Sequence, residues 1–127
     1  MFFSIRPVLQ EDGRVDLYAK QGTTWRLVLT LRDKEGKPLN ISFIREVRGQ
    51  VRRKPSDTQF VRNFNCSVVD AANGRIQIEL SASQTATIPA RDFGWTKYVY
   101  DIEVVLDNGD VYRILEGNLY VSAEVTK

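Results

Sequence analysis

Two acidic residues, Asp101 and Glu103, alternate along the chain in a pattern that could serve acid–base chemistry. Residues two apart on a β-strand point to the same face, with Cα atoms roughly 6.5–7 Å apart. Paired carboxyl groups of this kind supply the acid and the nucleophile of a glycosidase. That chemistry also needs a cleft and a carboxyl kept protonated by burial, whereas we expect a flat, arginine-rich sheet face here. We therefore predict that the protein is not an enzyme.

The rest of the sequence offers little further catalytic or cofactor chemistry. The chain has no histidine and a single cysteine, Cys66. Histidine is the commonest general base and metal ligand, so its absence argues against a structural zinc site and a Ser/Cys–His mechanism. No glycine pair is followed by a helix in a phosphate-binding arrangement. We expect no cofactor, no metal and no small-molecule ligand.

The charge is nearly balanced, with 18 basic and 16 acidic residues in 127 and a net charge of +2. A nucleic-acid partner is therefore not predicted. The densest basic stretch comprises Arg45, Arg48, Arg52, Arg53, Lys54 and Arg62. It could grip a phosphate backbone with Phe60 and Phe64 as stacking platforms, form a solvated face balanced by nearby acids, or meet an acidic partner protein. The balanced charge favours the solvated face, and we keep Arg48 and Arg52 as interface candidates.

Aromatic residues supply the other interface candidates. Phe93 and Trp95 flank a glycine in a segment that we expect to be a loop. Exposed aromatics there would suit a protein interface or a sugar platform, or would fold back onto the sheet edge. At the start of the chain, Phe2 and Phe3 either pair as an edge strand or dock on a neighbour, and we favour docking. This start lacks the basic lead of a secretion signal, and no apolar run reaches membrane length, so we expect no membrane association.

Period-two patterning predicts the elements that position these residues. Strand-like alternation recurs near residues 15–19, 25–31, 45–53, 60–69, 76–80, 98–106 and 111–122, with turn residues between most of these runs. A short helical turn is expected near 82–88, capped by Ser81 or Ser83 and stopped by Pro89. The pattern predicts one all-β domain over 1–127, an immunoglobulin-like antiparallel β-sandwich of about seven strands, with 1–13 as an N-terminal arm or edge strand.

Asn108-Gly109 between apolar runs predicts the terminal hairpin. A two-residue turn would place Leu106 opposite Val111, Val104 opposite Arg113, Ile102 opposite Leu115 and Tyr100 opposite Gly117. Asp101 and Glu103 then face outward and should meet Arg48 and Arg52 of the neighbouring strand in an exposed ladder of ion pairs. Asp101 would face Glu116, a like-charge contact that needs neighbouring arginines.

Three segments together resemble a known group of proteins. They are residues 21–29 (QGTTWRLVL), residues 78–89 (IELSASQTATIP), and residues 98–126, with YVYDIE before the Asn-Gly hairpin and RILEGNLYV after it. This ordered set resembles small virion proteins of tailed phages and is similar to the immunoglobulin-like N-terminal domain of phage upper-baseplate proteins. The resemblance spans roughly residues 15–127 and departs at 91–97, where the approach to the YVYD strand is longer.

The resemblance implies a non-enzymatic virion component of the tail, baseplate or collar, assembled in the host cytoplasm. Its expected partners are other virion proteins or further copies of the chain in a symmetric assembly. The alternative from another class is a carbohydrate-binding or adhesive sandwich that uses Trp95, Phe93 and a nearby tyrosine.

Overall fold

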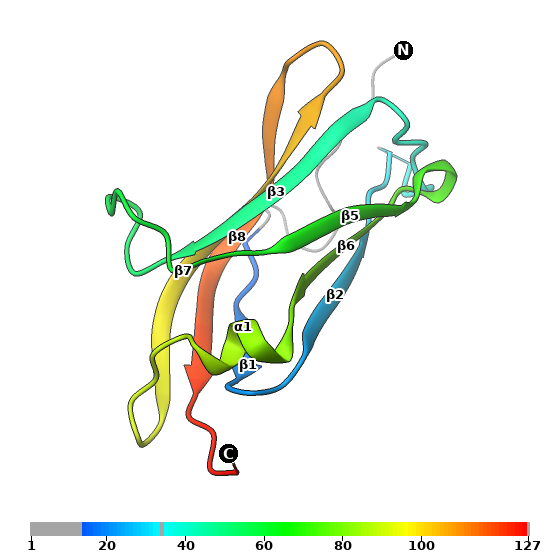
Figure 1. Ribbon diagram of the computed structural model, residues 1–127. Helices are drawn as coiled ribbons and strands as arrows, with labels where there is room; N and C mark the ends of the chain where they lie inside the picture. The colour runs from blue at the N-terminus through cyan, green and yellow to red at the C-terminus, as the bar shows by residue number, and fades with distance from the viewer. Residues whose placement is uncertain (1–13, 34, 127) are drawn as a thin grey trace.

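The computed structural model describes residues 14–33 and 35–126, and within these ranges the chain forms eight strands, one short α-helix and one 3₁₀ helix (Figure 1). The elements are β1 (Leu17–Lys20), β2 (Trp25–Thr30), β3 (Ile44–Arg52), β4 (Arg62–Asn63), β5 (Asn65–Asp70), η1 (Ala71–Asn73), β6 (Arg75–Leu80), α1 (Ala82–Ala86), β7 (Trp95–Leu106) and β8 (Val111–Ser122). Phe2 and Phe3, and with them the predicted arm 1–13, lie outside the described residues.

The strands form two sheets that pack as a sandwich, which confirms the predicted fold class. One sheet has the order β1-β8-β7-β3-β4 and the other β2-β6-β5. This division is the immunoglobulin arrangement, with an extra β4 beside the third strand. The prediction of purely antiparallel sheets was wrong in one place, because β1 runs parallel to β8. A long connection between the two strands permits that parallel pairing.

The structure has eight strands in its described residues rather than about seven, because one predicted strand is split in two. The expected strand over 60–69 is two strands, because the chain passes from one sheet to the other at Phe64. Before this residue β4 pairs with β3, and after it β5 pairs with β6. Phe64 is buried between the sheets, where its ring lies 5.8 Å from that of Trp25 and 6.0 Å from that of Tyr100. The crossing residue therefore belongs to the core.

The β7–β8 hairpin projects beyond the three-stranded sheet (Figure 1) and keeps only part of its predicted register. Ile102 pairs with Leu115 and Tyr100 with Gly117, as predicted. Nearer the turn the pairing shifts by one residue, so that Val104 lies opposite Tyr112 and Val105 opposite Val111. The turn holds three residues, because the N–H of Leu106 donates to the carbonyl of Asp110 at 2.8 Å. A bulge beside Ile102 absorbs the extra residue.

The predicted helical turn is α1, and a capping box fixes it. The Ser81 hydroxyl accepts from the N–H of Gln84, whose side chain accepts from the N–H of Ser81. After the helix the hydroxyl of buried Tyr98 donates to the carbonyl of Pro89. Such a bond at the start of this strand is the tyrosine corner of immunoglobulin-like sandwiches. Across the ranges described here, no helix is long and apolar enough to span a membrane.

Candidate functional site

The side of the five-stranded sheet that faces away from the three-stranded sheet carries three of the four predicted site residues that the structure describes. Alternation puts Leu17, Tyr98 and Leu119 into the core and turns their neighbours outward. We call this side the outer face; it is formed by Arg14, Asp16, Tyr18, Lys20, Arg48, Gln50, Arg52, Trp95, Lys97, Asp101, Glu103, Arg113, Glu116, Asn118 and Tyr120.

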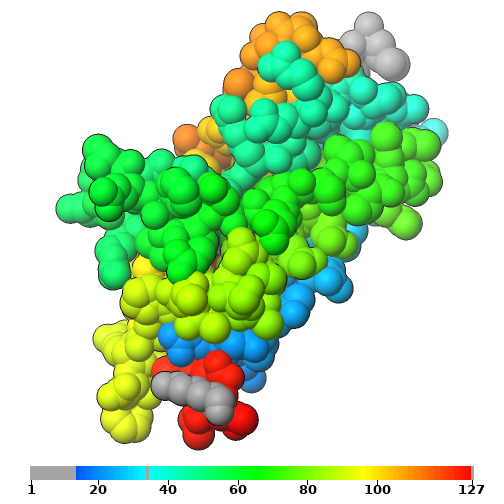
Figure 2. All heavy atoms as spheres, viewed as in Figure 1, coloured from blue at the N-terminus to red at the C-terminus, as the bar shows by residue number. Residues whose placement is uncertain are grey.

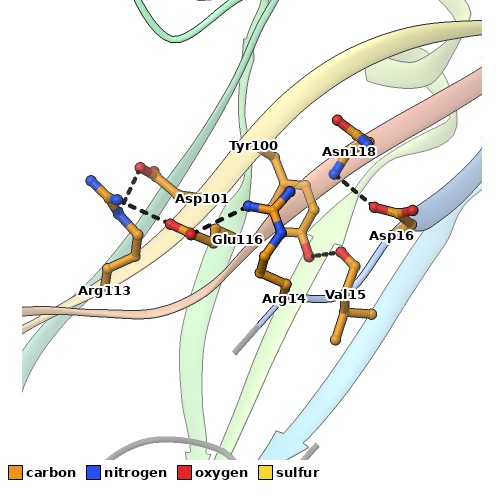
Figure 3. Close-up of polar contacts among 8 residues, drawn as sticks. All are labelled: Arg14, Val15, Asp16, Tyr100, Asp101, Arg113, Glu116 and Asn118. Atoms are coloured by element: carbon orange, nitrogen blue, oxygen red, sulfur yellow. Dashed lines mark hydrogen bonds and ion pairs between the residues drawn. The ribbon is translucent and has the colours of Figure 1, made fainter. Parts of the chain in front are cut away.

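The middle of the outer face is a charged network (Figure 3). Asp101 and Glu116 are direct cross-strand neighbours, the like-charge contact that the sequence predicts. Arg113 contacts both, with its Nε 3.3 Å from Asp101 Oδ2 and its Nη1 3.0 Å from Glu116 Oε2. Arg14 adds a third link at 3.4 Å to the other oxygen of Glu116. The prediction that neighbouring arginines offset the mismatch is confirmed.

The predicted ladder between β3 and β7 forms only in part. Arg48 lies opposite Glu103 and pairs with it, Nε to Oε1, at 3.1 Å. Arg52 does not pair with Asp101, because the register places Gln50 opposite that carboxylate. Instead Arg52 donates to the carbonyl of Asp57 at 2.6 Å and to the side chain of Gln50 at 2.7 Å. Arg52 therefore anchors the loop after β3 rather than the strand pairing.

The outer face is hollowed where a flat surface was expected. A groove of about 410 Å³ runs over Arg52, Tyr100, Asp101, Arg113 and Asn118. Partial burial raises the pKa of Asp101, with Arg113 acting against the rise and the neighbouring carboxylates adding to it. A raised pKa is what a general acid needs, but Glu103, the other member of the predicted pair, is held by Arg48. The arrangement thus neutralises both carboxylates with arginines.

One end of the outer face is an aromatic cluster of Tyr18, Trp95 and Tyr120. The Tyr18 ring stacks on Tyr120 with centroids 5.2 Å apart and meets Trp95 edge-on at 5.4 Å. Tyr18 is 56% exposed and Trp95 37%. Trp95 begins strand β7 rather than lying in a loop, so its ring rests on the sheet. Phe93, 86% exposed, stays in the loop before β7.

The structure therefore brings Arg48, Arg52 and Trp95 onto one surface and leaves Phe93 beside it. Sequence reasoning missed Tyr18 and Tyr120 as named partners of Trp95. Tyr18 lies opposite Tyr120 because β1 pairs in parallel with β8, whereas Lys97 lies opposite Tyr120 through the β7–β8 hairpin. Each tyrosine alternates with buried neighbours, which is a signal for an outward side chain. Nothing in that alternation shows that the two strands are adjacent.

Two further features of the described part of the chain concern metal ligands and buried polar side chains. No group of three or more histidine, cysteine, aspartate or glutamate residues there is arranged to hold a metal ion. Every buried side-chain nitrogen and oxygen in the same ranges has a hydrogen-bond partner. Comparison with models of protein families and with curated proteins finds no match to this chain.

Proposed function

We propose that the protein is a non-enzymatic structural component of a bacteriophage virion, an adaptor or decoration protein of the tail, baseplate or collar. It acts through contacts with other virion proteins or further copies of itself and is assembled in the host cytoplasm. The phage assignment depends on the resemblance of residues 21–29, 78–89 and 98–126 to such proteins. The contact function depends on the outer face.

The observation that supports the contact function is that exposed aromatic side chains and a network of ion pairs lie on the same face of the sheet. Trp, Tyr and Arg are the residues that dominate binding energy at protein interfaces. Here Trp95 and Tyr18 lie at one end of the outer face, and Arg113 and Arg48 lie fixed by carboxylates in its middle. Rings that rest on one another lose little conformational freedom when a partner covers them. The face is thus prepared for a macromolecular contact.

Mass spectrometry of particles purified from the phage that encodes this chain tests the proposal. We expect the chain in the particles, and its copy number to fall by about thirtyfold or more when Trp95 and Tyr18 are both changed to alanine, since exposed aromatic anchors contribute about 1–2 kcal/mol or more each. Val28→Ala is the matched control, because Val28 is a 50% exposed apolar side chain on the opposite sheet. Absence of the unchanged chain from the particles would contradict the proposal.

A carbohydrate-binding module is the second candidate, and the aromatic cluster beside the polar groove favours it. Sugar rings stack on exposed aromatic faces while their hydroxyls bond to groups such as Asn118 and Arg52, which line the groove. A glycan array separates the two candidates. A sugar binder shows a specific signal that Trp95→Ala abolishes, whereas a protein that acts only in assembly shows no signal to lose.

A further inference from the structure

A second hollow, distinct from the outer-face groove, lies at the end of the sandwich beside the tyrosine corner. It measures about 550 Å³ and is lined by Arg53, Pro89, Ala90, Arg91, Thr96, Lys97 and Tyr98. The lining contains three cations and no carboxylate. In Figure 2 the β3–β4 loop (green) and the segment before β7 (yellow) project from the same side of the molecule. The hollow draws its cations from these two regions and from β7.

The arginines of this hollow are held in place by contacts other than ion pairs. The guanidinium of Arg53 lies 5.7 Å from the centre of the Tyr98 ring, a cation–π contact. The backbone N–H of Arg91 donates to Thr96 Oγ1 at 2.9 Å, and its guanidinium Nη2 donates to the carbonyl of Trp95 at 2.6 Å. Both side chains therefore keep their place without a carboxylate, so the cost of ordering them is already met before a ligand binds.

The charges of these residues are uncompensated, in contrast with those of the outer face. Arg14, Arg48 and Arg113 each form an ion pair with a carboxylate. Across residues 14–33 and 35–126, Arg53, Arg91 and Lys97 form none. The acids nearest in sequence to Arg53, Arg91 and Lys97 are Asp57, Asp92 and Asp101, and none of the three lines the hollow. Three convergent cations without a counter-charge favour an anionic ligand.

We propose that this hollow binds an acidic segment of a partner protein, with carboxylates that pair with Arg53, Arg91 and Lys97. The proposal deepens the proposed function and rests on it, because it names the chemistry of the partner. Charge complementarity gives the ligand class, and the exposed side chains of Phe93 and Trp95, which lie in the chain between the lining residues Arg91 and Thr96, offer apolar contact for a peptide. A nucleic acid fits less well, because a phosphate backbone calls for a longer basic track than three cations on a chain of net charge +2.

Binding of fluorescein-labelled hexaglutamate to the full chain tests the proposal by fluorescence anisotropy at low and moderate salt. We expect saturable binding that weakens with salt and falls by about tenfold or more when Arg53, Arg91 and Lys97 are all changed to serine. The matched control changes Lys37, Arg45 and Arg75 to serine, which removes the same net charge from exposed positions outside the hollow. The control should stay within about twofold of the unchanged chain, because screened charges outside the hollow contribute little.

Equal losses in the two triple variants would overturn the proposal, as would a single-stranded oligonucleotide that binds more tightly than the peptide at the same salt. Amide chemical shifts of the unchanged chain during titration with hexaglutamate give a readout that needs no variant to fold. Shifts centred on Arg53, Arg91 and Lys97 support the proposal, and shifts centred elsewhere overturn it. Particles that contain the chain while hexaglutamate fails to bind would sink this inference alone and leave the virion function standing.

Discussion

At the scale of single residues, Arg113 holds the charged network of the outer face together. Cross-strand pairing sets Asp101 directly opposite Glu116, and like charges in that position destabilise a sheet. Arg113 contacts both carboxylates, at 3.3 and 3.0 Å. One guanidinium thus turns a repulsive pair into a network. The sequence predicts the mismatch and the need for an arginine, but not which arginine, because Arg113 reaches Asp101 only through the shifted register near the turn.

Arg113→Met should therefore lower the free energy of unfolding by about 1 kcal/mol, because it removes two ion pairs and leaves two carboxylates facing each other. Arg48→Met is the control, since it breaks a single exposed pair with Glu103 and should cost less than about 0.5 kcal/mol. Urea denaturation at pH 7 measures both. Equal effects of the two substitutions would show that Arg113 does not act on the Asp101–Glu116 mismatch.

Asp101 makes a prediction about pH. Partial burial raises its pKa in the folded state, so the folded protein holds this proton more tightly than the unfolded chain does. Its contribution to stability is then fully present below the unfolded pKa of about 3.9 and is lost as pH rises through the folded pKa. Asp101→Asn should remove this dependence. We expect the variant to gain stability relative to the unchanged protein between pH 4 and pH 7, measured by urea denaturation at each pH.

The opposite trend at Asp101 would contradict the assignment. If Asp101→Asn instead loses stability relative to the unchanged protein as pH rises from 4 to 7, the ion pair between Asp101 and Arg113 outweighs the effect of burial. Glu103→Gln serves as the control for loss of a charge on the same strand face, since Glu103 pairs with Arg48 rather than Arg113.

Tyr98 links the helical connection to the start of β7. Its side chain is buried, and its hydroxyl donates to the carbonyl of Pro89. Tyr98→Phe should lower the free energy of unfolding by about 1–1.5 kcal/mol, the usual value of a buried hydrogen bond, because the carbonyl is left unpaired. Tyr112→Phe is the control, as the Tyr112 ring is 45% exposed. Thermal and urea denaturation should show no change for Tyr112→Phe. If Tyr98→Phe also leaves the free energy of unfolding unchanged, the hydrogen bond from Tyr98 to Pro89 does not stabilise the fold.

At the scale of elements, the terminal hairpin shows how far sequence patterning reaches. Period-two alternation predicts which residues of β7 are buried, and Tyr98, Tyr100, Ile102, Val104 and Leu106 are all buried. It does not determine the turn length, because Asn108-Gly109 suits a three-residue loop as well, with Gly109 in the left-handed region at φ 91°. The bulge at Ile114 of β8, opposite the Ile102–Glu103 step of β7, then restores the predicted register further along. The bulge offsets the one-residue shift that the three-residue turn introduces, and neither feature can be predicted from the alternation of residues alone.

The β1–β8 pairing is the element that sequence patterning could not supply. Parallel pairing of the first and last strands is a contact between distant parts of the chain, and the outward alternation of Tyr18 or Tyr120 holds no information about it. The candidate site is likewise predictable from the sequence only in part. Arg48 is identified from residue type and parity and Trp95 from residue type in a segment expected to be a loop, whereas the aromatic cluster requires knowledge of which strands are adjacent.

Gly117 makes this pairing possible. A Cβ at this position would lie 2.2 Å from the carbonyl oxygen of Val15, the same oxygen that accepts from the Tyr100 hydroxyl at 2.5 Å. Gly117→Ala should push the segment before β1 off β8 and lower the free energy of unfolding by about 2–3 kcal/mol, at the upper end of overpacking costs. Gly94→Ala is the control for backbone strain alone, because Gly94 also has a positive φ, 73°, but a Cβ there meets nothing within 4 Å; it should cost about 1 kcal/mol and leave β1 unchanged. Faster hydrogen exchange of β1 amides in Gly117→Ala should accompany the loss, and normal exchange there would contradict the explanation.

At the scale of the whole molecule, the sandwich presents different chemistry on different surfaces. The outer face holds aromatics and arginines paired with carboxylates, whereas the end of the sandwich holds unpaired cations around a hollow. The core between the sheets is apolar apart from Thr85 among the described buried residues. An apolar core of this kind suits a protein that acts through protein–protein contacts, because substitutions on its surface leave the core packing intact.

Cross-linking mass spectrometry of purified phage particles tests the central claim most directly, because it reports both presence in the virion and the surface in contact. Lys20 and Lys97 lie on the outer face, and Lys37 lies in the loop between β2 and β3. We expect links from Lys20 and Lys97 to another virion protein or a further copy of the chain, and none from Lys37. Particles without the chain, or links from Lys37 alone, would contradict the account.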